Sequence, residues 1–517
     1  MVAPGARPAS AVFEDGAVQL TLAFGDVRQL LPAMAFRANA FYLDGFAPDR
    51  NPAMWDRSVI RALARRAAAG ATLATWSVAR TLRDHLSSAG FEWTRHPGIG
   101  GKREVLSACF SPRHVVRPVH PPAIGERQAV VVGAGLAGAC TAAALAAQGF
   151  EVTVLDRNQA PASGSSGNPA GLFHATVHGD DNPYARLFRA AALHTARLLG
   201  PLPQVQVPHR ADGLLRLELG RTVAQMQALV NRLGLPAEVV QVLDQPAASQ
   251  RAGLPLPGPA WLYPRGGWVD HAALVRQRLQ RPGVTFRGGQ QVHALRRDGS
   301  QWVCLDVDGR PLASASHLVL ANAEQAQPLL HSVGGPTLPL VRNRGQVSLV
   351  PAQRALSGLR LPVAGAGYAL PLPDGRLLCG ASTRDDGEDT HLLEEDHRAN
   401  RDRLDALFGL QLTDDVSQWG GRVGWRVQTP DRLPVAGPVV AFAGVGHLPV
   451  DQCHRVPREP GLHLACAFGA RGITLAPLLA DVVAARIAGS AVPLEQQLVD
   501  QVDPARWTVR QARRTRA

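Results

Sequence analysis

The clearest hydrophobic pattern in the chain is a pair of short apolar runs on either side of an alanine-rich run. Residues 129–132 are apolar throughout and include three valines, which predicts a short buried strand. Residues 136–148 are mostly alanine and leucine, which are strong helix formers, and predict a helix. Residues 151–155 carry valine at alternate positions and predict a second strand, which ends at Asp156. The stretch is uncharged as far as Phe150, but its glycines indicate strand plus helix and not a membrane span.

Three glycines follow the first predicted strand with the spacing G-x-G-x-x-G. Gly133 permits a tight turn, Gly135 lets a pyrophosphate approach the backbone, and Gly138 lets the helix pack closely on the strand. The free amide groups and the positive dipole end of the helix then face the diphosphate. Asp156 follows 18 residues after Gly138, and its carboxylate can accept hydrogen bonds from a ribose diol. Together these features predict a dinucleotide site.

Further glycine-rich segments favour FAD over a nicotinamide cofactor. Residues 162–171 form a loop of small residues that can lie against a diphosphate and a flavin. Residues 468–474 form a turn that leads into an apolar helix predicted at 475–488, and the amides of this turn can face an anion. Residues 317–323 predict another core strand of the nucleotide domain. A nucleotide domain drawn from both ends of the chain, with a substrate domain between them, is the layout of flavoprotein oxidases.

The composition is that of an ordinary globular protein. With 517 residues, 46% apolar and 19% charged, the chain is long enough for roughly two to four folding units. Its six cysteines are scattered without a Cys-x-x-Cys pair, which argues against a zinc ribbon or a disulfide framework and fits reduced thiols in the cytoplasm. No signal peptide is visible at the N-terminus, and no histidine or cysteine group has the spacing of a metal site.

The net charge of +12 is concentrated toward the two ends of the chain. Residues 1–120 have a net charge of +6, residues 506–517 hold five arginines and no acid, and the part between them is nearly neutral. This distribution indicates a polyanion bound by part of the surface. All but one of the 54 basic residues are arginine, so an arginine-rich composition with a solvated tail is the alternative explanation.

Several segments of the chain carry a family resemblance. In the second part of the chain these segments are 162–168, 263–268, 344–346, 429–434 and 469–472. In the first part they are 42–48, 51–55 and 101–104. Together they resemble the amine and D-amino-acid oxidase superfamily and, more closely, the family of bifunctional enzymes that make 5-methylaminomethyl-2-thiouridine in tRNA. The resemblance runs nearly end to end, and the stretch from Leu43 to Trp55 is specific to the methyltransferase half of that family.

The resemblance implies two successive activities on the wobble uridine of certain tRNAs, which bind through the anticodon stem-loop. An FAD-dependent domain removes the carboxymethyl group from 5-carboxymethylaminomethyl-2-thiouridine, giving 5-aminomethyl-2-thiouridine and glyoxylate. An S-adenosylmethionine-dependent domain then methylates the amine to 5-methylaminomethyl-2-thiouridine. The family is expected to act in the cytoplasm as a monomer, without a metal and away from membranes.

The resemblance also implies roles for particular residues of the oxidase half. Arg426 would bind the substrate carboxylate, Tyr368 would support it, and Arg471 would lie near the flavin. An arginine suits this task because its fork matches the two carboxylate oxygens. The residues expected to hold FAD are Gly133, Gly135, Gly138, Asp156, Arg157, Ser165, Gly167, Asn168, Gly469, Gly472, Ile473 and Thr474.

The methyltransferase half is expected to be incomplete. Residues 18–26 match a late strand of that fold, with Gly25 and Asp26 at the adenine edge, and Asp44 ends a strand where the target amine should lie. The alternative for Asp44 is a structural carboxylate at a strand end. The family has further strands and a glycine-rich cofactor loop ahead of this point. We therefore expect an open parallel sheet edge and no methylation by this chain alone.

The predicted fold class is α/β, with a Rossmann-like FAD-binding domain of the D-amino-acid-oxidase type. The expected order is a partial Rossmann-like methyltransferase domain at 1–112, a Pro-rich linker at 113–127, the FAD-dependent domain at 128–505 and a basic tail at 506–517. An α+β substrate domain is inserted at roughly 211–260 and 336–436. The alternative function is a free-standing FAD oxidase of glycine, sarcosine or a D-amino acid. A tRNA-binding scaffold with a vestigial FAD site is a third hypothesis.

Overall fold

The computed structural model describes residues 9–14, 18–98, 100–101, 103–112, 127–352, 354–385, 388–413, 415–443 and 451–514. Beyond its first five residues the chain divides into two compact units, 6–124 with 485–499 and 125–484 with 500–517. The predicted linker at 113–127 lies outside the described residues except for Arg127, and Lys102 also lies outside them.

The first unit is built on a four-stranded sheet with two helices on one face. Its elements are β1 (Ala9–Phe13), β2 (Val18–Leu22), α1 (Val27–Ala33), β3 (Ala38–Leu43), α2 (Arg57–Arg66), β4 (Ala67–Thr75), α3 (Arg80–Ser88), β5 (Phe91–Pro97) and β6 (Glu104–Phe110). The strand order is β3-β4-β6-β5, with β3 parallel to β4 and the other pairs antiparallel. Ile60 of α2 and Leu82 and Leu86 of α3 are buried in the core that they form with the sheet. Burial of such apolar stripes is the main stabilising contribution to this unit.

The predictions for the first unit concern the strand at 18–26 and the parallel edge of the sheet. The strand predicted at 18–26 is present over 18–22, but within the described residues it pairs with β1 in a separate two-stranded sheet. Asp26 caps α1 and lies 2.6 Å from the Arg28 guanidinium, so its carboxylate has a local structural task. β3 is an edge strand paired in parallel with β4, as expected, and Tyr42 on it is 83% exposed.

The second unit contains a six-stranded nucleotide-type sheet. Its elements are β7 (Gln128–Val132), α4 (Leu136–Ala147), β8 (Glu151–Leu155), α5 (Pro183–Leu199), α8 (His271–Leu279), β15 (Val284–Arg287), β16 (Ala294–Asp298), β17 (Gln301–Leu305), β18 (Pro311–Ala315), β19 (His317–Leu320), α9 (Ala326–His331), β25 (Val435–Val440), β26 (Arg458–Cys466) and α11 (Gly472–Ala488). The last residues of α11 and the greater part of α12 (Gln496–Val502) fall in the range 485–499 that is assigned to the first unit. The order is β15-β8-β7-β19-β26-β25, parallel except for β25. The predicted strand–helix–strand unit at 129–156 is confirmed. The strand predicted at 317–323 stops at Leu320, and the helix predicted from residue 475 begins at Gly472.

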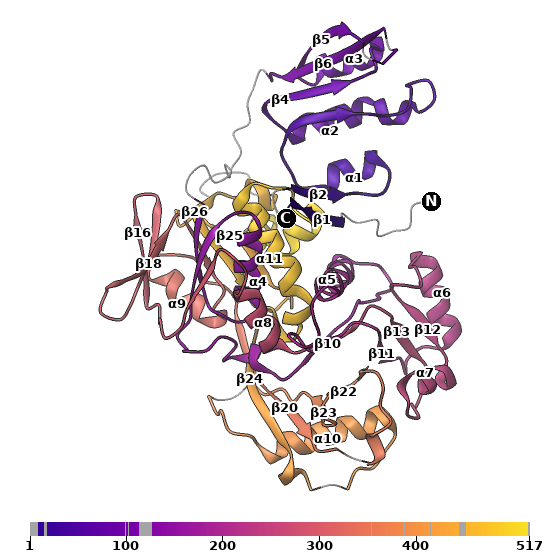
Figure 1. Ribbon diagram of the computed structural model, residues 1–517, viewed down its shortest axis with the longest axis vertical. Helices are drawn as coiled ribbons and strands as arrows, with labels where there is room; N and C mark the ends of the chain where they lie inside the picture. The colour runs from indigo at the N-terminus through magenta and orange to yellow at the C-terminus, as the bar shows by residue number, and fades with distance from the viewer. Residues whose placement is uncertain are drawn as a thin grey trace. The chain divides into compact units, whose positions relative to one another are not determined.

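Alternation along β7 explains why this sheet is covered on both faces. Val130 and Val132 pack in one core with Trp302 and Cys304 of the antiparallel sheet β16-β17-β18. Val131, between them, points to the other face, where it lies close to Gly138 of α4. The antiparallel sheet and the helices α4 and α11 therefore lie on opposite sides of the strands (Figure 1). Parallel strands buried in this way read as continuous apolar runs, which is the pattern seen in the sequence.

An eight-stranded sheet forms the other half of the second unit. Its elements are β11 (Leu214–Leu217), α6 (Val223–Leu233), β12 (Gln241–Leu243), α7 (Gln245–Ala252), β13 (Ala260–Tyr263), β20 (Val341–Val350), β21 (Val363–Ala364), β22 (Tyr368–Pro371), β23 (Leu377–Gly380), α10 (Glu394–Phe408) and β24 (Gly420–Gln428). The order is β12-β13-β11-β21-β22-β23-β20-β24. A small sheet, β10 (His209–Arg210), β14 (Gly267–Val269) and β9 (Gly171–Phe173), accompanies it.

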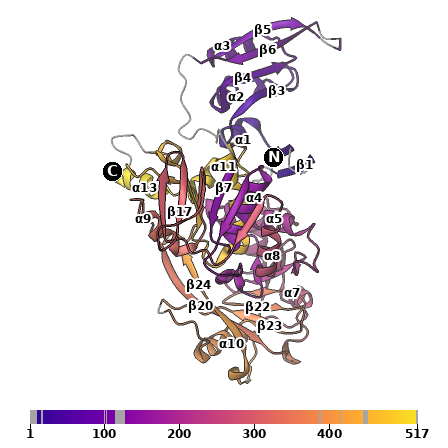
Figure 2. The same cartoon turned by 60° about the vertical axis from the view of Figure 1, so that its left-hand side comes forward.

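The two faces of the eight-stranded sheet differ in what packs against them. On one face, Leu404 and Leu407 of α10 and Ala248 of α7 pack against Val363 and Cys379. Figure 2 shows α10 beneath β22 and β23 on this side. Because side chains alternate along a strand, the neighbouring residues of the same strands point to the opposite face, which is free of α10.

The segment expected as a basic tail is in part a docked helix, α13 (Arg506–Arg514). Arg506 is buried, and its Nε and Nη2 donate to the two oxygens of Asp431 at 3.0 and 3.2 Å. Arg510 donates to the same carboxylate at 2.6 Å, and Arg513 donates to the carbonyl of Asp451. Burial alone would raise the pKa of Asp431, but these arginines hold it well below its usual range. At least part of the terminal positive charge is therefore used inside the fold.

We expect Asp431→Asn to destabilise the second unit strongly, because it leaves the buried Arg506 without its counter-ion. Breaking one partner of a buried ion pair costs about 3–5 kcal/mol in free energy of unfolding. Thermal unfolding and limited proteolysis near the C-terminus measure the effect. The control is Asp451→Asn, whose carboxylate pairs with the half-exposed Arg455 at 3.1 Å and should cost at most about 1 kcal/mol. Equal stability of the two variants would contradict the assignment.

Candidate active site

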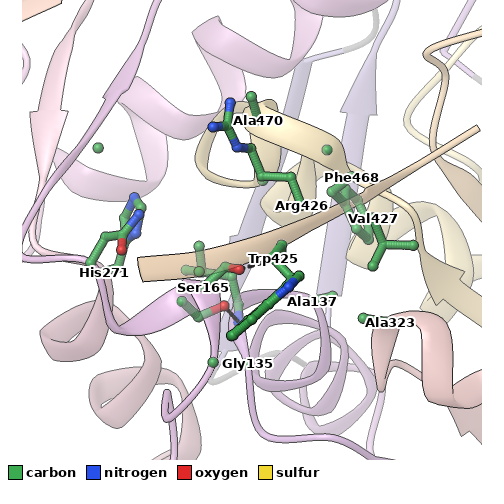
Figure 3. A pocket seen from close by; sticks show the side chains of 18 of the residues that line it. Gly135, Ala137, Ser165, His271, Ala323, Trp425, Arg426, Val427, Phe468 and Ala470 are labelled. Carbon is green, nitrogen blue, oxygen red and sulfur yellow. Dashed lines mark hydrogen bonds between the residues drawn. The ribbon is translucent and has the colours of Figure 1, made fainter. Parts of the chain in front are cut away.

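A cavity of about 850 Å³ in the second unit is lined by the glycine turn after β7 and by one face of the eight-stranded sheet. Ser165 and Trp425 lie at its centre in Figure 3, with Gly135 on one side and Arg426 on the other. Most of the sequence-predicted site residues line this cavity: Gly133, Gly135, Asp156, Arg157, Ser165, Asn168, Tyr368, Arg426, Gly469, Arg471, Gly472 and Ile473. Four do not: Gly138, Gly167 and Thr474 are outside the lining, and Asp44 belongs to the first unit, where it follows β3 with an exposed side chain.

Two glycines of the first turn have no room for a side chain. A Cβ on Gly133, which has φ +105°, would lie 2.8 Å from the carbonyl oxygen of Ala321. A Cβ on Gly138 would lie 1.7 Å from the carbonyl oxygen of Gly133. Gly138 therefore permits α4 to pack on β7, as predicted, without itself facing the cavity. α4 begins at this turn, and its N-cap, Gly135, provides no side chain to bond the free amides. Such a helix start is suited to a diphosphate.

Asp156 has a structural task in addition to the predicted one. Its carboxylate accepts hydrogen bonds from the backbone N–H of Ala134 at 2.7 Å and of Asn158 at 2.8 Å. These bonds fix the glycine turn against the end of β8. A carboxylate has about four acceptor positions, so it can also bind a ribose diol in the cavity that it lines.

The small-residue loop at 162–168 is fixed between α4 and β24. Arg422 of β24 donates to the carbonyls of Ser163 and Gly164 at 2.7 and 2.8 Å, and Ser165 Oγ donates to the carbonyl of Trp425. On the other side, Ser166 Oγ accepts from the N–H of Leu136 at 2.9 Å. A Cβ on Gly167 would lie 2.5 Å from the Arg422 guanidinium. The absence of a side chain at Gly167 therefore leaves room for the Arg422 guanidinium, and Gly167 itself does not line the cavity.

Some buried polar atoms in the cavity wall have no hydrogen-bond partner among the described residues, and a bound FAD would supply one. Within the described part of the chain, the buried Oδ1 atoms of Asn168 and Asn322 have no hydrogen-bond partner, and both residues line the cavity. An unpaired buried polar atom is unfavourable, so each calls for a ligand that donates a hydrogen bond. His271 lines the same cavity, and burial lowers its pKa to about 4, so its ring is neutral there. The sequence predicted Asn168 but not Asn322 or His271.

The substrate end of the cavity is formed by one row of the eight-stranded sheet. Tyr368 of β22 is paired with Ala364 of β21 on one side and with Gly380 of β23 on the other. Arg426 of β24 reaches the same face, where a guanidinium nitrogen donates to the carbonyl of Ser382. Burial raises the pKa of Tyr368, although the charge of Arg426 opposes the rise, so the hydroxyl stays protonated and can donate. A guanidinium and a phenol thus face the same space.

Arg471 approaches this space from the turn before α11. Its Nη1 lies 3.1 Å from Nε2 of His174, whose Nδ1 bonds the carbonyl of Ala175 at 2.6 Å. Nδ1 must therefore carry the proton, and Nε2 accepts from Arg471. Burial, the charge of Arg471 and that of Arg216 lower the pKa of His174 to about 3. The His174 ring is stacked on Tyr263, with ring centroids 5.0 Å apart.

The sequence did not predict His174 or Arg216, although both line the cavity. Neither lies in a glycine-rich turn or in a motif with a fixed spacing. Arg216 is on β11 and His174 directly follows β9, and these strands belong to two different sheets, so only the packing of the two sheets brings the residues together. Trp425 precedes the predicted Arg426, and its ring is covered by the Arg342 guanidinium at 4.6 Å.

The described residues contain neither a candidate membrane-spanning helix nor a candidate metal site. No helix in this part of the chain is both long and apolar enough to cross a bilayer. Nor do three or more His, Cys, Asp or Glu side chains gather there in a group that could hold a metal ion.

Comparisons with protein families match both units. Residues 128–486 match the family model of FAD dependent oxidoreductases, and residues 5–111 match that of S-adenosyl-L-methionine-dependent methyltransferases. A relative from Methylibium petroleiphilum, described as the tRNA 5-methylaminomethyl-2-thiouridine biosynthesis bifunctional protein MnmC, is 44% identical over 96% of this chain and 78% of its own length. A protein of the same description from Azoarcus sp. is 40% identical over 97% of this chain and 79% of its own.

Solved structures share the fold of the second unit. Glycine oxidase from Geobacillus kaustophilus has a TM-score of 0.56 and 22% identity, covering 70% of this chain and 95% of its own. Iminodiacetate oxidase from Chelativorans sp. has a TM-score of 0.58 and 22% identity, covering 73% of this chain and 99% of its own. The predicted D-amino-acid-oxidase-like fold, preceded by a methyltransferase-type domain, is confirmed.

We expect Gly138→Ala to lose FAD, because the added Cβ would meet the Gly133 carbonyl at 1.7 Å and force α4 away from β7. The ratio of flavin absorbance to protein in the purified variant measures this loss. Gly200→Ala is the control, since this glycine is helical at the end of α5, lies outside the cavity lining, and would place its Cβ at an ordinary 3.6 Å from the carbonyl oxygen of Ala196. A Gly138→Ala protein that keeps a full complement of flavin would show that the turn tolerates a side chain.

Proposed function

Because the chain belongs to the family of bifunctional tRNA 5-methylaminomethyl-2-thiouridine biosynthesis proteins MnmC, we propose that its second unit acts on the wobble uridine of tRNA. The reaction is oxidative removal of the carboxymethyl group from 5-carboxymethylaminomethyl-2-thiouridine. The glycine Cα–H and the amine N–H give up two electrons and two protons to form a C=N bond, with FAD as the two-electron acceptor. Water then hydrolyses this imine to 5-aminomethyl-2-thiouridine in the tRNA and glyoxylate. The substrate side chain is an N-substituted glycine, that is, a secondary amine with a carboxylate.

One observation carries this proposal: Arg426 and Tyr368 reach the same cavity as the dinucleotide turn. A guanidinium fork recognises a carboxylate through two parallel hydrogen bonds. Within the described residues Arg426 has no carboxylate partner, and its guanidinium bonds only the carbonyl of Ser382. It is therefore available for an anionic group that enters the cavity.

The residues of the site bind and orient the substrate. Gly133, Gly135, Asp156 and the loop at 162–168 would hold FAD, which would supply the two-electron oxidation. Arg426 and Tyr368 would hold the carboxylate, which fixes the direction of the adjacent C–H bond. His174, neutral because of its lowered pKa, holds the Arg471 guanidinium in place without competing for the substrate's charge.

The relatives favour a tRNA substrate over a free amino acid. The identity to the bifunctional relatives extends over 96% of the chain, including the part that matches the methyltransferase model. A free-standing oxidase of glycine, sarcosine or a D-amino acid would not account for that part. We further infer that the protein acts in the cytoplasm, where its tRNA substrate is found, and that it functions as a monomer.

We expect Arg426→Ala to reduce kcat/KM for carboxymethylaminomethyl-tRNA by about 10²- to 10⁴-fold, because a charge-assisted bidentate contact is lost. FAD should stay bound, since Arg426 does not hold the glycine turn. Nucleoside mass spectrometry of the tRNA gives the turnover, and flavin absorbance gives the cofactor content. Arg398→Ala, which removes an exposed guanidinium paired with Glu394, is the control. Undiminished turnover by the Arg426 variant would refute its role.

The second prediction concerns Asp44 of the first unit, which matches the S-adenosyl-L-methionine-dependent methyltransferase family. Asp44 is exposed just after the edge strand β3, and we propose that its carboxylate binds the target amine. With aminomethyl-tRNA and labelled S-adenosylmethionine, Asp44→Ala should incorporate label at least about 10-fold more slowly than the unchanged protein, because the amine loses the group that orients it. Incorporation at equal rates would refute this role.

A further inference from the structure

Arg216 is a cavity residue that the proposed reaction does not use. It lies on β11, where it is paired with Ala364 of β21, and Ala364 is paired in turn with Tyr368 of β22. Directly paired residues point to the same face of a sheet, so Arg216 and Tyr368 share the face that lines the cavity. They are two strands apart, which places their Cα atoms about 10 Å from each other.

Arg216 has no counter-charge in the described part of the chain. No hydrogen bond or ion pair connects it to a described residue. The next acid along the chain, Glu218, lies just after β11 and is already engaged by Trp261 Nε1 at 3.1 Å and by Arg221 at 2.7 Å. A partly buried guanidinium without a partner is unfavourable, because it has lost water without gaining a counter-ion.

The groups around Arg216 are a second cation, two neutral rings and one carboxylate that is already bound. The charge of Arg216 influences His174, Tyr263 and Arg471. His174 is neutral, and burial raises the pKa of Tyr263 to about 12, so the phenol is neutral as well. Arg471 is the second cation, and it bonds His174. The charge of Glu218 also reaches Tyr263, but Arg221 and Trp261 hold that carboxylate. Within the described residues neither cation is therefore bonded to a carboxylate.

The substrate carboxylate is already accounted for at one end of this row, by Arg426 and Tyr368. The residues between Tyr368 and Arg216 are small: residues 364–367 are alanine and glycine, and they line the cavity. With both carboxylate oxygens bound by Arg426 and Tyr368, Arg216 is left for a second anionic group of the substrate. The small residues leave the space that the body of the substrate would occupy between the two.

We propose that Arg216 binds a phosphate of the nucleotide being modified, and so makes the site selective for nucleotide-linked N-carboxymethyl amines over free amino acids. The inference rests on the proposed function, because in a carboxymethylaminomethyl-tRNA the anions other than the carboxylate are backbone phosphates. Arginine is well suited to this task, since its fork matches two phosphate oxygens. Arg216 is thus a specificity residue, whereas Arg426 positions the reacting group.

The first test measures binding without turnover. The FAD-loaded full-length protein is titrated with uridine and with uridine 5′- and 3′-monophosphates, and the absorption spectrum of the bound flavin is followed. At least one monophosphate should bind about 10-fold or more tightly than uridine. Arg216→Met, which keeps the packing of the side-chain stem, should reduce that ratio to within about twofold. Arg216→Lys should restore part of it, and Arg398→Ala, which removes an exposed guanidinium paired with Glu394 outside the cavity, should leave the ratio unchanged.

The second test measures turnover of the 5-carboxymethylaminomethyl-2-thiouridine nucleoside and its monophosphate. Arg216→Met should raise KM for the monophosphate about 10-fold and leave the nucleoside unchanged. An equal loss on both substrates would place Arg216 at the carboxylate and overturn the proposal. A changed flavin midpoint potential in the ligand-free variant would place Arg216 at the cofactor and also overturn it.

The two tests separate this inference from the proposed function. If the wild-type protein oxidises none of the modified substrates, the proposed function fails, yet the binding ratio of monophosphate to uridine still decides the role of Arg216. If the wild-type protein oxidises them but binds uridine and both monophosphates equally, the phosphate assignment is wrong and the proposed function stands. Flavin content equal to that of the wild type shows that each variant is folded.

Discussion

The connection between the loop at 163–165 and strand β24 is the interaction on which the site depends. Arg422 and the backbone of Trp425 bond this loop from the substrate sheet, while the loop in turn bonds the start of α4 through Ser166. The dinucleotide turn and the substrate-facing row of the sheet therefore become two walls of one cavity. Because Arg426 directly follows Trp425 on β24, the same connection sets the position of the carboxylate-binding guanidinium relative to the cofactor cradle.

Two groups of arginines in the second unit differ in whether a carboxylate lies against them. Arg506 and Arg344 are buried against carboxylates, Arg506 with Asp431 and Arg344 with Asp396 at 2.5 Å. They hold elements together, and their charges are compensated inside the fold. Arg216, Arg426 and Arg471 line the cavity without a carboxylate partner in the described part of the chain. A preorganised group of unpaired cations is unfavourable until an anion arrives, and this is the physical basis for expecting anionic ligands there.

This division changes the meaning of the chain's positive charge. The sequence placed a large share of it at residues 506–517 and suggested a surface for a polyanion. In the structure, three of those arginines bond Asp431 and the backbone of Asp451, so they stabilise α13. The positive charge best placed for a nucleotide lies instead inside the cavity, on residues that are scattered over β11, β24 and the turn before α11. A net charge summed along the sequence does not distinguish these two situations.

The sequence by itself determined the elements whose rules are local. The apolar run of β7, the glycines of the turn, the alanine-rich helix and Asp156 each follow from short-range requirements, so the dinucleotide site and its fold class could be predicted from them. The motif around Arg426 could be recognised for the same reason. Tertiary structure decided the rest: that Gly167 leaves room for Arg422, that Arg506 is internal, and that Arg216 faces the same space as Tyr368. The position of Arg216 depends on the register between β11 and β21, which are more than 100 residues apart, and register is set by the packing of whole sheets rather than by any local pattern.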